Sequence, residues 1–203
     1  MNRNLWLLVA AQGLFFTNNV AFLAINGLVG LSLAPREWMA TLPIMGYVVG
    51  GALSTGPVAW CQSRWGRKAS FQIGLLVAVL STLLCAWAVM HQDFWLLVFA
   101  TVLAGFYSAS GQLYRFAAAE LARPEFREKA VSFVLAGGLA GAVLGPNLAS
   151  WTRHLVAAPF AGAHLALAVV ALAGLVVMTF IDFPPALARS GSGGSGRPLS
   201  EIP

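Results

Sequence analysis

Charged residues are scarce in this chain of 203 residues: Asp, Glu, Lys and Arg together make up 9% of it. A soluble domain carries about 25%, so there are too few charges to cover a water-facing surface. The two cysteines, Cys61 and Cys85, have no C-x-x-C or metal-ligand spacing, which argues against a disulfide framework and a metal site. We expect no cofactor.

An enzyme buried in the membrane would need paired carboxylates, a Ser with Lys or His, or a cluster of histidines at depth. The three histidines, His91, His154 and His164, lie far apart in the sequence and have no acidic partner at depth. No acidic residue falls in the central part of a long apolar stretch. The sequence therefore argues against an enzyme, and it shows no carboxylate that could carry protons across a membrane.

What the chain does have is long apolar runs, and about 20 apolar residues are enough to cross the hydrocarbon core as a helix. A β-barrel would instead need alternating segments of about 10 residues, and none occur. We predict an all-α integral membrane protein with six transmembrane helices in a domain at 1–185. The predicted spans are approximately 5–33, 38–61, 70–90, 94–121, 130–151 and 162–181.

Residues 186–203 are rich in Gly and Ser, which is typical of a flexible linker. We expect this segment to be cytoplasmic and to be the start of a central loop that is cut short.

The positions of Lys and Arg predict the orientation of the spans. With the N-terminus in the cytoplasm, nine of the 12 basic residues fall on the cytoplasmic side and only Arg36 and Arg153 fall outside. Both termini are then cytoplasmic, and the predicted location is a bacterial plasma (inner) membrane. Because topology accounts for the net charge of +5, the charge gives no reason to expect a nucleic-acid partner.

Polar residues recur on one face of the first predicted helix, where Gln12, Asn19 and Asn26 are spaced by seven. Asn18 lies beside this stripe. Such a stripe either lines a cavity and hydrogen-bonds a solute, or joins neighbouring helices. We predict solute contacts for Asn18, Asn19 and Asn26, with the packing role as the alternative.

The fourth predicted helix carries Gln112 and Arg115 on the face that also holds Gly105 and Ser108. Apart from Glu120 at the very end of the span 94–121, Arg115 is the only charge within a predicted span, and a charge at the bilayer centre costs at least about 2.5–3.5 kcal/mol. We predict that Gln112 and Arg115 contact the solute, and Arg115 weakly favours an anionic one. Alternatively, Arg115 extends to the inner headgroups.

Small residues form matching stripes in the second and fifth predicted helices. Gly46, Gly50 and Ser54 precede a Gly-Pro pair in the second, and Gly138, Gly141 and Gly145 precede Pro146 in the fifth. The third and sixth predicted helices are the two most apolar. The six helices therefore divide into two units of three with opposite topology, the 3+3 inverted repeat known from transporters.

The turn between the second and third predicted helices resembles a signature of the major facilitator superfamily, Gly-x-x-x-Asp-Arg/Lys-x-Gly-Arg-Arg/Lys. Arg64, Gly66, Arg67 and Lys68 match it, whereas Ala59 and Ser63 replace the Gly and the Asp. In that family the carboxylate helps to lock the two halves together in the outward-open state. Ser63 can cap a helix but carries no charge, so the resemblance implies an incomplete latch.

The fifth predicted helix resembles the family's antiporter signature, Gly-x-x-x-Gly-Pro-x-x-Gly-Gly. Gly141, Gly145 and Pro146 match, and Ala149 and Ser150 replace the last two glycines. The resemblance implies that this helix and the turn at 63–68 form a conformational gate.

The family has twelve helices in two halves, so the chain resembles the N-terminal six-helix half of such a transporter. The implied function is secondary active transport of a small solute by alternating access. The implied partners are the bilayer, the solute, and either a C-terminal six-helix half or a second copy. The alternative is a truncated or accessory six-helix membrane protein that acts by binding partners.

Overall fold

The computed structural model describes residues 3–183, and the predicted linker at 186–203 lies outside the described residues. Between Arg3 and Phe183 the chain is helical and has no strand. The α-helices, in chain order, are α1 (Arg3–Leu33), α2 (Leu42–Met90), α3 (Phe94–Gly111), α4 (Tyr114–Leu121), α5 (Arg127–Thr152) and α6 (Ala161–Thr179). Two short 3-10 helices, η1 (Glu37–Met39) and η2 (Pro124–Phe126), precede α2 and α5.

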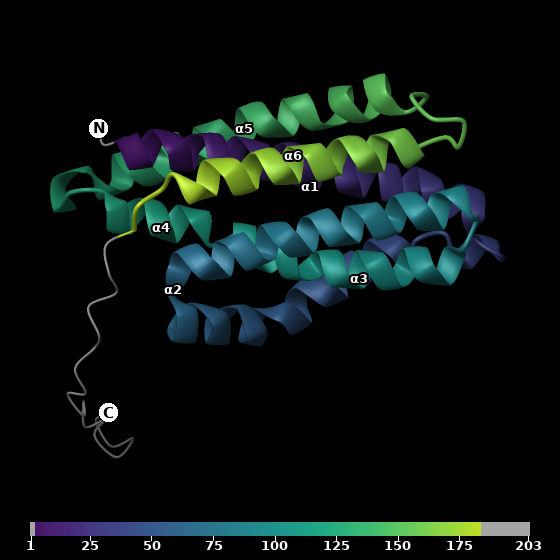
Figure 1. Cartoon of the computed structure of the whole chain (residues 1–203), viewed down its shortest axis with the longest axis horizontal. Coiled ribbons are helices and arrows are strands. Elements are labelled where there is room, and N and C mark those ends of the chain that lie inside the picture. The colour runs from purple at the N-terminus through teal and green to yellow at the C-terminus, as the bar shows by residue number, and fades with distance from the viewer. Residues whose placement is uncertain (1–2, 184–203) are drawn as a thin grey trace, which may run out of the picture.

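Five helical segments of the described chain are long and apolar enough to cross a membrane. The longest, Glu37–Met90, contains one residue with non-helical backbone angles, Gly66, at φ 83° and ψ 171°. Figure 1 shows that the two arms of α2, 42–65 and 67–90, run antiparallel from this point. A single glycine therefore reverses the chain, because this backbone region is essentially open to glycine alone.

The expected loop between the spans 38–61 and 70–90 is therefore wrong in its extent. Helical structure continues through 62–69 on both sides of Gly66. The first arm also begins later than expected, at Leu42, because Glu37–Met39 form η1. Pro43 then lies in the first turn of α2, where its missing N–H has no helical partner to lose.

The expected span 94–121 is interrupted between α3 and α4. The N–H of Leu113 bonds the carbonyl of Ser110 at 3.1 Å, three residues back, which tightens the turn. Beside this turn the ring of Phe15 lies against Gly111, where an added Cβ would stand 2.1 Å from Cε2 of Phe15. The absence of a side chain at Gly111 thus lets α1 approach the helix at its break.

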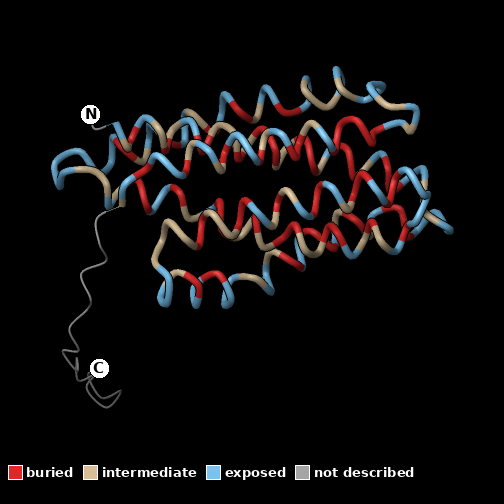
Figure 2. Tube along the Cα trace, viewed as in Figure 1, coloured by how far each residue is buried: buried red, intermediate tan, exposed pale blue. Residues whose placement is uncertain are grey.

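The helices form two layers that α6 connects (Figure 1). In one layer α1 packs on α5 and α6, and in the other α2 packs on α3. Because α6 also packs on α2, it joins the two layers. The sides of α5 that turn away from α1 are mostly exposed (Figure 2), so α5 is the least covered of the long helices.

Glycines set the closest helix crossings. A Cβ added to Gly141 of α5 would lie 2.0 Å from the carbonyl oxygen of Gly13 in α1. A Cβ added to Gly50 of α2 would lie 2.1 Å from the carbonyl oxygen of Val102 in α3. At both crossings the backbones are in direct contact, which is how small residues stabilise helix pairs in membranes.

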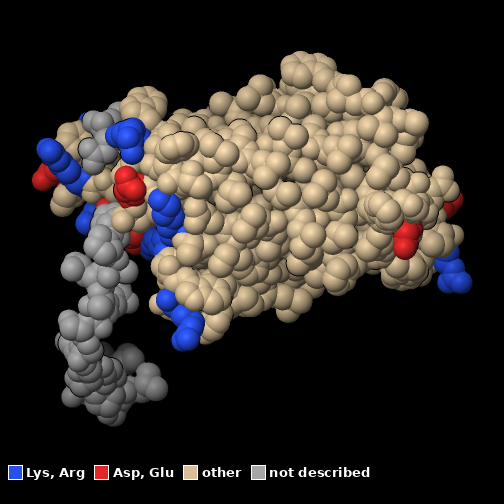
Figure 3. Space-filling model, in the orientation of Figure 1, with Lys and Arg blue, Asp and Glu red and all other residues tan. Residues whose placement is uncertain are grey.

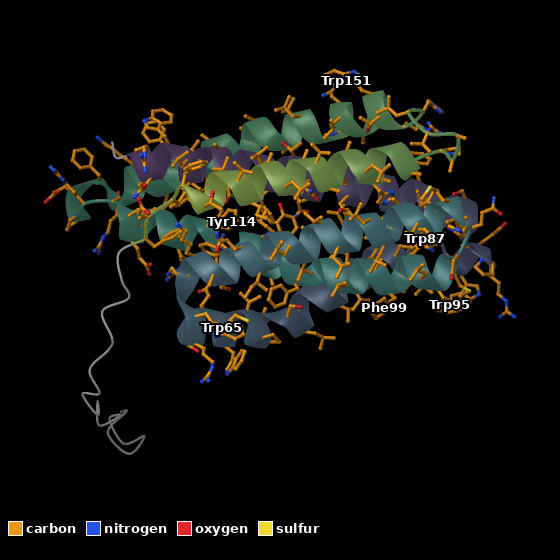
Figure 4. All side chains as sticks on the ribbon, in the orientation of Figure 1. Trp65, Trp87, Trp95, Phe99, Tyr114 and Trp151 are labelled. Carbon is orange, nitrogen blue, oxygen red and sulfur yellow. The ribbon has the colours of Figure 1, made fainter. Side chains whose placement is uncertain are left out.

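All seven tryptophans are more than half exposed and lie near helix ends; they are Trp6, Trp38, Trp60, Trp65, Trp87, Trp95 and Trp151. Figure 4 shows Trp87 and Trp95 at the end of the bundle opposite to Trp65. Exposed tryptophans at both ends of apolar helices are typical of the two membrane–water interfaces. This placement supports a bundle that spans the bilayer.

Candidate functional site

The predicted solute-contact residues of α1 differ in their surroundings. Asn18 is buried, and its Nδ2 donates a hydrogen bond to the carbonyl oxygen of Leu167 in α6 at 2.8 Å. Asn26 is also buried and donates to the carbonyl oxygen of Phe22, one turn back, at 2.9 Å. Asn19 is half-buried and lies between them in sequence. In this conformation Asn18 therefore joins two helices, as the packing alternative predicted.

Gln112 and Arg115 are both exposed in the described bundle. Gln112 caps the C-terminal end of α3, and Arg115 lies in the first turn of α4. The guanidinium carbon of Arg115 is 5.0 Å from the centroid of the Phe116 ring, a cation–π arrangement. No carboxylate of the described chain forms an ion pair with Arg115.

Phe15 fixes the position of α1 relative to this region. Its ring packs against Gly111 and makes edge contacts with Tyr107 and Tyr114, with ring centroids 5.2 and 5.8 Å away. All three aromatic side chains are almost fully buried. The crossing thereby brings Phe15 of α1 to the break beside Gln112, although the sequence places them far apart.

The basic turn of α2 forms ion pairs with residues that the sequence interpretation did not name. Arg67 Nη2 pairs with Oε1 of Glu120, near the end of α4. Lys68 Nζ donates to the carbonyl oxygen of Thr179 at 2.8 Å and lies 3.9 Å from Oδ1 of Asp182. The turn is therefore tied to the ends of α4 and α6.

Asp182, near the end of the described chain, also contacts two residues at its start. Arg3 Nη2 lies 3.7 Å from its Oδ2, and Nδ2 of Asn4 donates to its carbonyl oxygen at 2.8 Å. Figure 3 shows the resulting gathering of charged side chains at one end of the bundle. We call this the basic end, defined by Arg3, Arg67, Lys68, Arg123 and Lys129. The sequence contained a signal for both Glu120 and Asp182: Glu120 lies at the end of the predicted span 94–121, Asp182 directly follows the span 162–181, and both spans are predicted to end on the side of the basic turn.

The remaining predicted gate residues lie in two places. The hydroxyl of Ser63 donates to the carbonyl oxygen of Trp60 at 2.8 Å, and Arg64 is exposed. Gly145 packs on α1, where an added Cβ would lie 2.7 Å from the carbonyl oxygen of Thr17. Pro146 follows inside α5 and is exposed. Gly141 and Gly145 thus contact α1, whereas Ser63 and Arg64 are exposed on the surface of the bundle.

No group of three or more His, Cys, Asp or Glu within residues 3–183 could hold a metal ion. His164 is buried in the first turn of α6, where Nδ1 lies 3.0 Å from the carbonyl oxygen of Phe160. The Phe22 ring packs beside it in a T-shaped arrangement, with the ring centroids 6.2 Å apart. His164 is thus part of the packed interior of the described bundle.

Comparison with known proteins places this geometry in context. A riboflavin transporter of Brucella anthropi, RfnT, is 34% identical over 202 residues, which cover 98% of this chain and 51% of the relative. Two uncharacterized MFS-type transporters of Bacillus subtilis, YddS and YdeG, are each 25% identical over 173 residues. These alignments cover 81% of this chain and 39% and 40% of the relatives. The chain thus spans about half the length of the curated relatives it matches, or less.

The model of the Major Facilitator Superfamily matches residues 5–202, nearly the whole chain. The apolar helices, the exposed tryptophans at both ends and the transporter relatives agree with that match. The chain therefore belongs to the Major Facilitator Superfamily, a family of membrane transport proteins rather than of enzymes.

Proposed function

We propose that this chain is the N-terminal half of a secondary transporter that moves a flavin-like solute by alternating access. The similarity to the riboflavin transporter extends over 98% of the chain and motivates the choice of solute. The observation that carries the proposal is the uncovered polar region at the α3–α4 break, where Gln112 and Arg115 are exposed. Polar side chains at membrane depth mark solute pathways more often than lipid contacts.

We further propose that the bundle contains six crossings arranged as a 3+3 inverted repeat, with each arm of α2 as one crossing. The two glycine crossings support this arrangement, since the second helix of each unit contacts the first helix of the other unit. Gly46, Gly50 and Ser54 also keep the spacing of Gly137, Gly141 and Gly145. An inverted repeat would generate the same crossing twice.

The chemistry of the proposed site suits a planar, polar solute. A flavin presents carbonyl oxygens and ring nitrogens along one edge and hydroxyl groups on its side chain. The guanidinium of Arg115 can donate to the carbonyls, and the amides of Gln112 and Asn19 can donate or accept. Asn18 and Asn26 would contact the solute from the same helix, α1. In this conformation their amides donate to protein carbonyl oxygens.

We propose that the turn at 63–68 and the α1–α5 contact form the gate. Arg67 and Lys68 are bound within this half by Glu120 and Asp182, which leaves Ser63 and Arg64 exposed for a second half. Gly66 fixes the turn that presents them. Gly141, Gly145 and Pro146 would let α5 move against α1, because the atoms nearest to an added Cβ at Gly141 are all backbone atoms of Gly13.

The proposed partner is a C-terminal six-helix half or a second copy, which would cover the exposed sides of α5 and of the first arm of α2. The proposed location is a bacterial plasma (inner) membrane with both chain termini in the cytoplasm. The charge distribution supports this orientation, because Arg3, Arg67, Lys68, Arg123 and Lys129 share one end.

Uptake of radiolabelled riboflavin by cells that cannot make flavins tests the proposal. Cells that express the chain alone and cells that express it together with a C-terminal six-helix half should differ, with uptake only where both halves are present. Arg115→Ala should lower uptake at least about tenfold, consistent with loss of a charged hydrogen bond. Arg36→Ala, at the opposite end of the bundle, is the matched control.

Unchanged riboflavin uptake in Arg115→Ala would remove Arg115 from the site. Absence of uptake of any solute, together with stable binding of another membrane protein in crosslinking, would support the accessory alternative instead.

A further inference from the structure

A pocket of about 320 Å³ lies at the basic end, outside the proposed solute region. It is enclosed by the start of α1, the end of α4, η2 and the first turns of α5. The lining residues are Leu5, Leu121, Ala122, Arg123, Phe126, Lys129, Ala130 and Phe133. The proposed transport cycle assigns this pocket no role.

The lining divides into an apolar part and a cationic part. Six of the eight lining residues are apolar, and the other two are Arg123 and Lys129. Lys129 Nζ lies 5.8 Å from the centroid of the Phe126 ring, which holds the ammonium group beside the apolar surface. Glu125 and Glu128 belong to the same segment, but neither lines the pocket. The ligand that fits is therefore amphipathic and negatively charged at one end.

The aromatic residues next to the pocket place it at the depth of lipid headgroups. Phe133 lines the pocket and packs on Trp6, with ring centroids 6.3 Å apart. Trp6 is 55% exposed and Phe133 is 44% exposed, so both reach the outer surface of the bundle. Exposed tryptophans near helix ends locate the membrane–water interface, with Arg123 and Lys129 on the aqueous side of this pair.

We propose that this pocket binds an anionic phospholipid of the leaflet at the basic end. Arg123 and Lys129 would bind the phosphate, and an acyl chain would run along Phe133 and Trp6. Basic pockets between transmembrane helices on the cytoplasmic side bind lipid headgroups in this way. A free anion would use the two cations but would leave the apolar lining exposed to water, so the composition of the pocket favours the lipid.

Native mass spectrometry of the full chain in detergent tests the proposal, with phosphatidylglycerol, phosphatidylcholine and glycerol 3-phosphate as separate probes. We expect retention of one phosphatidylglycerol and little retention of the other two. The double variant Arg123→Gln/Lys129→Gln should bind phosphatidylglycerol about 10- to 30-fold more weakly, as expected for two lost cations near the membrane surface. Arg36→Gln/Arg153→Gln removes two cations at the opposite end and should leave retention unchanged.

A second variant separates lipid from free anion. Ala122→Phe fills the apolar part of the pocket while Arg123 and Lys129 remain, so it should also weaken phosphatidylglycerol retention. Glycerol 3-phosphate competing with phosphatidylglycerol at similar concentrations would overturn the lipid assignment in favour of a soluble anion. Equal retention by the wild type and both pocket variants, with circular dichroism showing that all are folded, would overturn the site itself.

Discussion

Gly141 of α5 packs directly on the backbone of Gly13 in α1, and a Cβ added at Gly141 would stand 2.0 Å from the Gly13 carbonyl oxygen. Backbone atoms cannot move aside as a flexible side chain can, so the two helices would have to separate. This contact therefore fixes how closely α5 approaches the rest of the bundle.

The first prediction concerns this contact. Gly141→Ala should destabilise the bundle by about 1–3 kcal/mol, the usual cost of overpacking a well-packed contact. Gly56→Ala is the matched control, because nothing lies within 4 Å of the Cβ it would add. Thermal unfolding in detergent measures both variants. Equal melting temperatures for the two variants would show that α1 and α5 are not in backbone contact.

The second prediction concerns the reversal of α2. Gly66 has φ 83° and ψ 171°, and nothing lies within 4 Å of an added Cβ. Gly66→Ala should therefore destabilise the bundle through backbone strain alone, by about 1–3 kcal/mol. Gly56→Ala again serves as the reference, since Gly56 is helical and equally open. A stabilised Gly66→Ala variant would mean that the chain passes this point as a continuous helix.

The third prediction concerns the ion pair at the basic end. The side chains of Arg67 and Glu120 are 29% and 51% exposed, so water screens their attraction. A double-mutant cycle with Arg67→Gln and Glu120→Gln should give a coupling of about 0.2–1 kcal/mol. The coupling should fall as salt is raised.

Arg64→Gln combined with Glu120→Gln is the control cycle, because Arg64 forms no ion pair among residues 3–183. A coupling for Arg64 as large as that for Arg67 would contradict the observed pairing.

The fourth prediction separates two neighbouring asparagines. Asn18→Leu removes the hydrogen bond to the Leu167 carbonyl oxygen and should cost about 0.6–1.7 kcal/mol of stability. Asn19→Leu should change stability little, because no hydrogen bond of its side chain occurs within the described bundle and it is only half-buried. If the proposed site is correct, Asn19→Leu should instead reduce riboflavin uptake. Melting temperature and uptake are measured on both variants. A lower melting temperature for Asn19→Leu together with reduced uptake for Asn18→Leu alone would reverse the assignment.

The family and most of the helix bounds follow from the sequence. The expected spans 5–33, 130–151 and 162–181 agree with α1, α5 and α6 to within a few residues. Long apolar runs leave the backbone no partner except itself, so helices form wherever such a run lies in lipid. The basic turn at 64–68 likewise indicated the family from the sequence, and the family match supports that resemblance.

Local pattern predicted the interior of the chain less well where tertiary contacts compete with it. The turn at Gly66 is one residue long, although its Gln, Ser and Arg neighbours indicated a loop at 62–69. The break at Gln112 lies beside the ring of Phe15, a residue nearly 100 positions away. Neither the sequence around Gln112 nor the sequence around Phe15 indicates that the two segments pack together.

The sequence by itself determined that the chain is a helical membrane protein and where its apolar helices lie, because hydropathy and Lys/Arg placement act locally along the chain. Only the tertiary structure decided that Asn18 faces α6 while Gln112 and Arg115 remain exposed. It alone paired Arg67 with Glu120 and Gly13 with Gly141. Those outcomes depend on which helix faces pack together, and packing is set by contacts between residues distant in sequence.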